Sequence, residues 1–597
     1  MSTFDFDPAA FEEMLLPLLK ELINTPLLSA EKIHTIVRRQ AKQSGRLFSK
    51  DQLLKSYRYF VESGSLAKQT KQFEQLLQTK PVRTASGVTP VTVLTKPFPC
   101  PGQCIFCPSD IRMPKSYLHD EPGAQRAERN VFDPYLQTYS RLQAFTNIGH
   151  SCEKVELIIL GGTWSFYPEA YQIWFIKRCF DALNDFSVGK DETKKVEEGY
   201  RSVQSATHDV PKQVSIKGKK LTKTYNQVIT ELFTNPEKLL GVDQQQTATW
   251  EELSAVHTVN ETAKVRCVGL VVETRPDHIS ESEVIRMRRL GCTKTQIGVQ
   301  SLQDSVLIKN KRGHDVASTR RAFRLLRQAG FKIHAHWMPN LYGSSPEKDI
   351  EDYKQLFEDS DFKPDELKIY PCSLIESAEL MKYYESGEWQ PYSDQELSHV
   401  LTECMMATPQ YCRLTRVIRD IPSTDIVVGN KKSNYREIVQ KQLEKNGLHS
   451  QNIRDREIKQ EQVSLSDLKL DELPYSTSVS DEVFLQFVTH EQKIAGFLRL
   501  SLPKIASFIE ELQHSAIIRE VHVYGQVSAI GESPEETKGK HEKAQHLGLG
   551  SRLIARAIEI AREKKFSKLH VISAIGTREY YRKRGFNDGE LYQYFEL

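Results

Sequence analysis

Cysteine is scarce in this sequence, and long apolar runs are absent. Its 10 cysteines are spread over 597 residues, which excludes the dense disulfide framework of small secreted domains. No stretch approaches the about 18 consecutive apolar residues of a membrane-spanning helix. The N-terminus is acidic, whereas a secretory signal peptide begins with basic residues and continues with apolar ones. We therefore expect a cytoplasmic protein with no membrane partner.

An excess of charge of one sign is also lacking. The chain has 81 Lys and Arg against 78 Asp and Glu, so its formal net charge is only +3. A basic surface for a polyanion must therefore be local. Residues 26–80 provide such an excess, because they hold 11 Lys and Arg against four acids, a difference of +7. Ser29, and the capping-box pattern of Ser49 and Gln52, predict two amphipathic helices in this segment.

The basic helices leave two interpretations open. Either they form a small helical unit whose charges are solvated, or they bind the phosphates of RNA, and charge alone favours neither. In the second case the side chains would position a stem while specifying little sequence. The candidate contacts are Arg38, Arg39, Lys42, Arg46, Lys55 and Arg58.

The length of the chain predicts three or four domains. Residues 1–80 read as the helical basic region. Over residues 81–410, short β-branched runs alternate with helical stretches, which indicates βα units around a parallel sheet in barrel or open form, with a polar insertion at about 186–260. Residues 411–475 are rich in charge and suit a connecting segment. Residues 476–597 read as a second α/β domain.

Three cysteines form the one local cluster of thiols. Cys100, Cys104 and Cys107 lie in PCPGQCIFCP, directly after the predicted strand VTVLT. Three thiolates in eight residues can ligate three irons of a [4Fe-4S] cluster and leave the fourth iron open. An open iron can chelate S-adenosylmethionine, whose reductive cleavage yields a 5′-deoxyadenosyl radical. The alternatives are a zinc site that lacks its fourth ligand and a fortuitous grouping.

The cysteine motif resembles that of the radical S-adenosylmethionine superfamily. Other residues that end predicted strands suit this resemblance, because active sites of barrels collect at that edge. A plain turn or a surface cap is the alternative at each position. The residues expected to bind S-adenosylmethionine are Gly161, Gly162, Thr163, Glu273 and Gln300.

A second motif lies near the C-terminus. QHLGLG, residues 545–550, fits Q/R-x-x-G-x-G/A before a predicted helix, where backbone N–H groups and the helix dipole favour a pyrophosphate. With the preceding strand EVHVYGQV and the later tyrosines, it resembles the GCN5-related acetyltransferases, which implies acetyl-CoA as ligand. The expected coenzyme residues are Glu520, Val521, His522, Val523, Gln545, Gly548, Leu549, Gly550 and Ser551, with Tyr580 or Tyr581 near the thioester.

The two motifs in one chain resemble the family of the Elongator catalytic subunit, a tRNA-modifying enzyme. The likeness rests on KPVRTASGVTPVTVLTKP, GHSCEKVELIILGGT, CVGLVVETRPD, IGVQSLQD, HVYGQV, QHLGLG and GTREYYRKRGF. It implies an α/β multidomain fold: a partial (β/α) radical S-adenosylmethionine barrel, then an acetyltransferase domain, with an N-terminal helical extension that binds tRNA.

The resemblance also implies an activity. The enzyme would be an acyltransferase that makes 5-carboxymethyluridine at wobble position 34, using acetyl-CoA and the 5′-deoxyadenosyl radical. The radical would take hydrogen from the acetyl methyl group, and the resulting carbon radical would add to C5 of uracil. Lys154 would reach acetyl-CoA from the radical domain. The partners would be the anticodon stem-loop of tRNA and an unidentified electron donor.

Two departures from the family pattern refine the expectation. The compact cysteine spacing resembles that of bacterial members, which implies a stand-alone enzyme rather than a large Elongator complex. Some members carry a cysteine-rich zinc site in the connecting stretch, but residues 451–457 here contain no cysteine, so we expect no zinc. Two other readings remain: a protein lysine acetyltransferase with a structural iron–sulfur cluster, and a non-catalytic RNA-binding scaffold.

Overall fold

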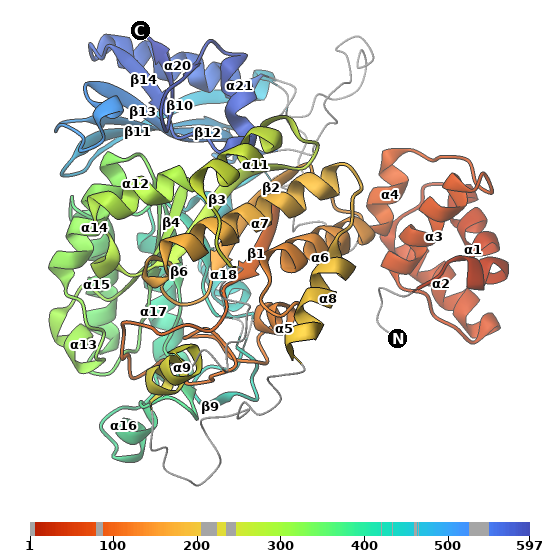
Figure 1. The fold of residues 1–597 in the computed structure, drawn as a ribbon, viewed down its shortest axis with the longest axis horizontal. Coiled ribbons are helices and arrows are strands. Elements are labelled where there is room, and N and C mark those ends of the chain that lie inside the picture. The colour runs from red at the N-terminus through yellow and green to blue at the C-terminus, as the bar shows by residue number, and fades with distance from the viewer. Residues whose placement is uncertain are drawn as a thin grey trace.

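The structure, a computed structural model, describes residues 6–78, 87–204, 224–234, 246–419, 421–432, 434–458, 463, 465–524 and 548–597. Three parts follow one another along the chain (Figure 1): a helical N-terminal unit, an α/β unit around a parallel sheet, and a C-terminal α/β unit. None of the helices in the described part is long and apolar enough to cross a membrane.

The N-terminal unit consists of four helices with their own core. They are α1 (Glu12–Asn24), α2 (Ala30–Ser44), α3 (Lys50–Glu62) and α4 (Lys71–Leu77). The side chain of Ser29 accepts a hydrogen bond from the backbone of Lys32, and Ser49 and Gln52 form the expected capping box. The predicted helical N-terminus is therefore confirmed. Its core of leucine, isoleucine and phenylalanine side chains is separate from that of the rest of the chain.

The central unit is built on seven strands that pair in chain order and run parallel. They are β1 (Thr89–Leu94), β2 (Lys154–Leu160), β3 (Arg266–Thr274), β4 (Lys294–Gln300), β5 (Lys332–Trp337), β6 (Glu366–Ile369) and β8 (Arg413–Arg416). Such an order with helical crossovers is that of a partial barrel, so the predicted fold class is confirmed. The helices between strands are α5 (Pro122–Arg129), α6 (Pro134–Asn147), α7 (Glu169–Ser187), α11 (Trp250–Thr262), α12 (Glu281–Arg289), α13 (Asp304–Lys309), α14 (Val316–Gln328), α15 (Pro346–Glu358), α16 (Met381–Glu385) and α17 (Asp394–Ala407).

The stretch expected as an insertion is partly built into the barrel. Its described residues form α8 (Thr193–Gln204), α9 (Tyr225–Thr234) and α11. Helix α11 packs against α7 and β3, and Asn260 donates a hydrogen bond to the carbonyl of Val265. Residues 250–260 therefore belong to the helical layer of the barrel. Their polar outer face concealed this role in the sequence.

The expected connecting segment also contributes to both sheets. Strand β8 joins the barrel, β9 (Ile426–Val428) pairs with β7 (Leu374–Ile375), and β10 (Lys469–Ser476) joins the C-terminal sheet. Helices α18 (Tyr435–Lys445) and α19 (Ile453–Arg456) lie between them. Strand β8 reads RLTR, which has no run of apolar residues, so its composition gave no strand signal.

The C-terminal unit is a mixed seven-stranded sheet. Its order is β10, β11 (Ser480–Val488), β12 (Ile494–Pro503), β13 (Ser515–Val523), β14 (Lys568–Val571), β16 (Gln593–Glu596) and β15 (Asn587–Asp588). Helices α20 (Leu549–Glu563) and α21 (Arg578–Arg582) complete it. Only β13 and β14 pair in parallel among the described strands of this sheet.

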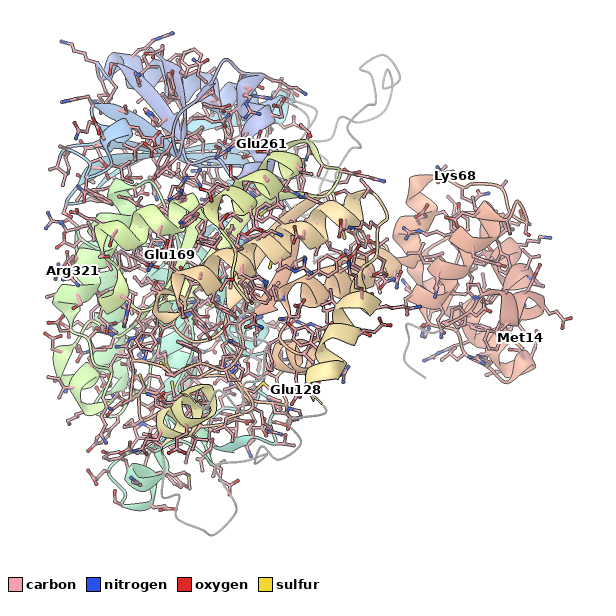
Figure 2. The ribbon with its side chains drawn as sticks, in the orientation of Figure 1. Met14, Lys68, Glu128, Glu169, Glu261 and Arg321 are labelled. Atoms are coloured by element: carbon pink, nitrogen blue, oxygen red, sulfur yellow. The ribbon has the colours of Figure 1, made fainter. Side chains whose placement is uncertain are left out.

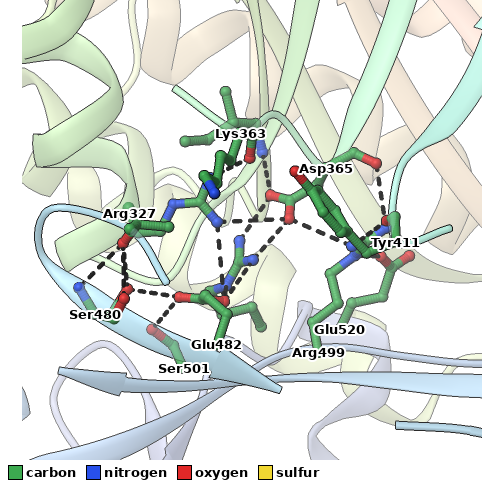
Figure 3. Close-up of polar contacts among 12 residues, drawn as sticks. Arg327, Lys363, Asp365, Tyr411, Ser480, Glu482, Arg499, Ser501 and Glu520 are labelled. Atoms are coloured by element: carbon green, nitrogen blue, oxygen red, sulfur yellow. Dashed lines mark hydrogen bonds and ion pairs between the residues drawn. The ribbon is translucent and has the colours of Figure 1, made fainter. Parts of the chain in front are cut away.

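Buried ion pairs join the two α/β units (Figure 3). Asp365, just before β6, pairs with Arg519 of β13 at 2.6 Å and with Arg499 of β12 at 3.5 Å. Glu482 of β11 pairs with Arg519 at 2.9 Å, and all four side chains are at most 1% exposed. On the outer side, Glu261 of α11, labelled in Figure 2, pairs with Arg578 and Arg582 of the C-terminal unit. The relative position of the units is thus fixed by charge as well as by packing.

Asp365→Ala is expected to destabilise the protein by about 3–5 kcal/mol, because it leaves buried guanidinium groups without a counter-charge. These groups, Arg519 first among them, hold the pKa of Asp365 below its usual value against the effect of burial. Stability from this pair is therefore lost as the pH falls toward that pKa. Chemical denaturation measures the effect, and Asp481→Ala, at an exposed pair, is the control. Equal stability of both variants would contradict it.

Candidate active sites at the two ends of the barrel

The three cysteines lie in the loop that follows β1, at the carboxyl edge of the parallel sheet. The Cys107 thiol is hydrogen-bonded to Cys104, and Arg312 donates to the Cys104 sulfur at 3.3 Å. The bond from Cys107, with the charges of Arg312 and Arg275, lowers the pKa of Cys104 well below its usual value. The Cys100 sulfur lies 3.8 Å from the hydroxyl of Thr163. The loop therefore brings thiols to the sheet edge beside buried positive charge.

The chemistry of this donor set fits an anionic iron–sulfur cluster. Among the residues that the structure describes, no three His, Cys, Asp or Glu side chains are grouped closely enough to hold a metal ion. The cysteine loop nevertheless offers three thiols, and the buried Nη1 of Arg275 has no hydrogen-bond partner among these described residues. Cations of this kind compensate the charge of thiolate-ligated iron. Cys100, Cys104 and Cys107 are accordingly the residues that would hold a cluster.

The residues expected to bind S-adenosylmethionine lie at the same edge. Gly161 has φ +128°, and a Cβ built there would clash with the side chain of Thr95, so glycine is required for packing whether or not a ligand binds. A Cβ at Gly162, with φ +84°, would meet the carbonyl oxygen of Lys115 at 3.9 Å, an ordinary contact, so the positive φ is what favours glycine there. Gln300 has φ +68°, and its buried Oε1 has no hydrogen-bond partner in the described part of the chain. A strained residue with an unpaired acceptor at a strand end suits a ligand site.

Glu273, the last of this set, is tied to the cysteine loop. Its Oε2 accepts a hydrogen bond from the hydroxyl of Tyr117 at 3.1 Å. Burial raises the pKa of Glu273, while Lys368 and Arg419 oppose that effect. The structure thus places Gly161, Gly162, Thr163, Glu273 and Gln300 on one edge with the cysteines. Which of them contacts S-adenosylmethionine stays a prediction.

Helix α9 holds the cysteine loop in place, a role that no pattern in the sequence indicated. The Asn226 side chain accepts a hydrogen bond from the backbone N–H of Cys100 at 3.0 Å and donates one to its carbonyl at 2.6 Å. The Tyr225 hydroxyl donates to the carbonyl of Met113 at 2.9 Å. Tyr225, Ile229 and Ile111 form a small core of their own. The helix therefore holds the loop at two points, Cys100 and Met113.

Asn226→Ala is expected to speed the loss of iron from the reconstituted protein, because it removes both hydrogen bonds that fix the Cys100 peptide. Iron release to a chelator measures this rate. Gln227→Ala, on the exposed face of the same helix, is the matched control. If the two variants released iron at the same rate, these hydrogen bonds would not position the loop.

A cavity of about 1220 Å³ lies at the opposite, amino-terminal end of the barrel strands. It is lined from the barrel side by Lys154, Arg266 and Lys294, which begin β2, β3 and β4. From the C-terminal unit it is lined by Val521, His522, Val523, Gly548, Gly550, Ser551, Tyr580 and Tyr581. Most of the expected coenzyme residues and Lys154 therefore share one cavity, but the side chain of Leu549 does not line it, because it is fully buried in the core of the C-terminal unit.

The strand that borders the cavity extends beyond its neighbour β14. Strand β13 pairs with β14 from Ser515 to Ile518 only, so residues 519–522 have no partner strand on the β14 side among the described strands. A ligand with amide groups can pair with such an edge. The carboxylate of Glu520 is engaged elsewhere, with Lys332 at 3.0 Å and Arg499 at 2.9 Å. Only the backbone of Glu520 is thus available for the expected role.

The glycine-rich turn precedes helix α20 as the sequence predicts. Gly548 is the N-cap residue, with φ +67°, and Leu549 and Gly550 begin the helix. A Cβ at Gly550 would clash with the hydroxyl of Tyr580. The N-terminus of a 15-residue helix therefore opens into the cavity with little side-chain cover, which suits a phosphate group. Gln545 lies outside the described residues.

Arg584 is a cavity residue that the sequence reasoning missed. Its guanidinium donates to the hydroxyl of Ser551 at 3.1 and 2.9 Å and stacks on Tyr580 at 3.5 Å. A cation beside a helix N-terminus adds to its attraction for a phosphate. The spacing of four residues from Tyr580 was the available signal. Tyr580 thus belongs to the phosphate end, whereas Tyr581 is buried and packs on Phe586.

Lys154 is half-buried in the cavity wall. Burial, with the charge of Arg266, lowers the pKa of Lys154. A lysine without a close carboxylate can act on a ligand as a hydrogen-bond donor. Lys154 lines the same cavity as Tyr581 and Gly550, which supports the expected contact with the coenzyme.

The basic residues of the N-terminal unit fall into two groups. Four are engaged within the unit or with the barrel: Arg39 with Glu21, Arg46 on the ring of Phe11, Lys55 with the carbonyl of Phe6, and Arg58 with Glu74 and the carbonyl of Thr146. Arg38 and Lys42 are exposed on α2 and make no hydrogen bond or ion pair with any residue that the structure describes. Phosphate contacts are therefore best supported at these two positions.

Two family models match the chain. The radical S-adenosylmethionine C-terminal domain matches residues 364–445, and the acetyltransferase (GNAT) family matches residues 451–586. The first covers the last barrel strands, and the second covers the unit that contains the glycine-rich turn.

Similar proteins extend over most of the chain. The tRNA uridine(34) acetyltransferase of Methanocaldococcus infernus is 37% identical over 537 residues, 87% of this chain and 88% of that protein. Elongator complex protein 3 of Homo sapiens is 32% identical over 528 residues, 85% of this chain and 84% of that protein. The solved structure of the archaeal Methanocaldococcus infernus Elp3 with an N-terminal deletion superposes with a TM-score of 0.66 at 33% identity, over 86% of this chain and 99% of that chain.

Proposed function

The chain belongs to the family of tRNA uridine(34) acetyltransferases and Elongator complex protein 3, and from this premise we propose that it makes 5-carboxymethyluridine at wobble position 34 of tRNA. One observation carries the proposal: a cysteine loop beside buried cations and a basic cavity beside a helix N-terminus lie at opposite ends of one half-barrel. Two different cofactors suit the two ends.

The residues present divide the work between these ends. When bound, the cluster and S-adenosylmethionine supply a 5′-deoxyadenosyl radical, and acetyl-CoA supplies a two-carbon unit. Cys100, Cys104 and Cys107 would hold the cluster. Gly550, Ser551 and Arg584 would hold the coenzyme phosphates at the N-terminus of α20. Lys154 would orient the acyl end from the barrel, with Tyr581 on the other wall.

Product analysis tests the proposal against its alternatives. The protein is reconstituted anaerobically with iron, sulfide and a reductant, then incubated with tRNA, acetyl-CoA and S-adenosylmethionine. Nucleoside mass spectrometry is expected to detect 5-carboxymethyluridine. Acetyl-lysine on added protein, without modified nucleoside, would favour a protein acetyltransferase, and tRNA binding without either product would favour a scaffold.

The enzyme is proposed to act alone with an external electron donor. Relatives that cover most of its length include proteins named tRNA uridine(34) acetyltransferase and others named Elongator complex protein 3. Activity of the purified chain with a chemical reductant would support a stand-alone enzyme. A requirement for added subunits would contradict it.

The double variant Arg38→Gln and Lys42→Gln is expected to weaken tRNA binding. Each phosphate that the protein no longer neutralises should reduce the salt slope of log K by about 0.7 to 0.9 units. These two side chains are exposed on α2 and make no hydrogen bond or ion pair with the described residues. Filter binding over a salt series measures the slope.

Arg58→Gln serves as the comparison for this prediction. Its bonds to Glu74 and to the carbonyl of Thr146 join the helical unit internally and to α6. We expect Arg58→Gln to lower the thermal stability of the protein and to leave the salt slope of tRNA binding nearly unchanged. An unchanged slope in the Arg38 and Lys42 variant would mean that these residues form a solvated face.

A further inference from the structure

Polar side chains fill the interior of the half-barrel toward the carboxyl ends of its strands, where apolar packing is usual. Gln296 of β4, His336 of β5 and Lys368 of β6 point toward one another from three adjacent strands. Gln296 is 2% and His336 5% exposed. Glu273 of β3 continues the group toward the strand ends, since its Oε1 lies 3.6 Å from Nδ1 of His336. These four residues are called the lumen cluster below.

The hydrogen bonds of the lumen cluster constrain where its protons lie. Oε1 of Gln296 accepts a bond from Nζ of Lys368 and lies 2.9 Å from Nε2 of His336. Because an amide oxygen only accepts, His336 carries its proton on Nε2 when the amide is oriented in this way. Nδ1 is then a bare acceptor that faces the carboxyl of Glu273. The cluster can therefore take up a proton between these two groups.

Lys368 has no carboxylate within ion-pair distance among the described residues. Among the residues that the structure describes, its Nζ bonds the neutral Gln296, whereas Lys294 pairs with Glu156 at 2.8 Å and with Glu366 at 3.0 Å. An ammonium group in a buried site without a paired anion is costly, so the neutral amine is favoured. The charged and titratable groups around it are Glu273 on β3, Lys294 on β4, His334 and His336 on β5, Glu366 on β6, Tyr370 just after β6, and Arg416 on β8.

The titration of the cluster agrees with this geometry. Burial lowers the pKa of Lys368 to about 7, which Glu273 opposes and Arg416 and Lys294 reinforce. Burial also raises the pKa of Glu273 and lowers that of His336 well below its usual value. Burial therefore disfavours the charged form of each of these three groups.

We propose that the lumen cluster accepts the proton that leaves C5 of the target uracil, with Lys368 as the group that finally holds it. This inference rests on the proposed function. Carboxymethylation forms a bond from C5 to the acetyl methyl carbon and leaves an unpaired electron on the ring. To restore the C5–C6 double bond, the ring loses one electron and the C5 proton. When bound, the iron–sulfur cluster would be the acceptor of this electron, since it would have given one to S-adenosylmethionine, and water would hydrolyse the thioester to release coenzyme A. The proton requires a base.

The position of the lumen cluster suits this role. Glu273 lies near the end of β3 on the cysteine edge, and its side chain is 23% exposed, so it is the accessible end of the chain of groups. Lys368 is linked to Glu273 through Gln296 and His336, because the Gln296 oxygen contacts both Lys368 and His336, and His336 faces Glu273. A proton taken by Glu273 at the edge can thereby pass into the buried part of the cluster. Lys368 acts through these neighbours.

The first test separates radical formation from product formation. In Lys368→Arg the guanidinium cannot take up a proton, and in Lys368→Met the amine is absent. Both variants are expected to form 5′-deoxyadenosine with acetyl-CoA and tRNA but to lose 5-carboxymethyluridine about 100-fold or more. When C5 of the uridine carries deuterium, we expect the Lys368→Arg variant to form 5-carboxymethyluridine still more slowly. The unchanged enzyme is expected to form it at the same rate with hydrogen or deuterium at C5. Lys382→Gln, on the exposed helix α16, is the control.

The outcomes distinguish the two proposals. If the unchanged enzyme made no 5-carboxymethyluridine, the proposed function would fail. If it made the product and Lys368→Arg made as much, with no deuterium effect, the lumen cluster would not be the proton acceptor.

A second test needs no cofactor. A lysine whose pKa is lowered by folding binds its proton more weakly in the folded than in the unfolded state, so stability rises with pH between the two pKa values. The thermal midpoint of the unchanged protein, relative to that of Lys368→Met, is expected to be lowest near about pH 6 and to recover toward about pH 9. A difference that did not vary with pH would mean that Lys368 remains charged and cannot accept the proton.

Discussion

Serine at positions 100, 104 and 107 is expected to abolish both iron binding and the reductive cleavage of S-adenosylmethionine. The hydroxyl group of serine does not ionise near neutral pH, whereas a thiolate is the ligand that iron–sulfur clusters require. The protein should stay folded, because the three cysteines lie in a loop outside the main core. The effect is measured by iron content, by the visible absorption of the iron–sulfur cluster and by the formation of 5′-deoxyadenosine.

A matched control shows that the loss is specific to these thiols. Cys152 is buried, and its thiol donates to the carbonyl of Leu142 at 3.6 Å, a bond that a serine hydroxyl can also make. Cys152→Ser should therefore retain iron and cleavage. Cleavage that survived in the triple variant without iron would disprove the radical assignment, and iron that survived would place the ligands elsewhere.

The sequence predicted the sites to the extent that their residues are neighbours along the chain. The cysteine spacing and the Gly548 to Gly550 turn are local patterns, and the structure gives each the predicted setting at a strand end or a helix start. The family resemblance built on them is confirmed by relatives that cover most of the chain. A local pattern is informative because backbone geometry alone relates its members.

The residues that the sequence did not predict act across long separations. Asn226 lies 126 positions after Cys100, and Gln296 lies 72 positions before Lys368. Each is an ordinary polar residue on its own element. Only the pairing of parallel strands and the docking of α9 bring such residues together. Arg58 is the opposite case. Its charge suggested a contact with RNA phosphate, whereas in the structure it bonds Glu74 and the carbonyl of Thr146.

Gly550→Glu is expected to prevent acetyl-CoA from binding. The new Cβ would clash with the Tyr580 hydroxyl, which rests on Gly550, while the Tyr580 ring stacks with Arg584. The carboxylate would also stand at the N-terminus of α20, where it would take the place of a phosphate and repel the rest of the coenzyme. Both effects are local to the cavity, so iron binding at the opposite end of the barrel should persist.

Gly199→Glu is the matched control, because a Cβ at Gly199 in α8 meets no atom of the described residues within 4 Å. This variant adds the same charge and the same side chain to another helix and should bind acetyl-CoA normally. Calorimetry on both variants, with circular dichroism and iron content as checks on folding, decides the matter. Unchanged affinity in a folded Gly550→Glu protein would remove the α20 turn from the coenzyme site. In that case the phosphates would have to bind along the other cations of the cavity, such as Arg266 and Arg436, and the assignment of Arg584 would fail with it.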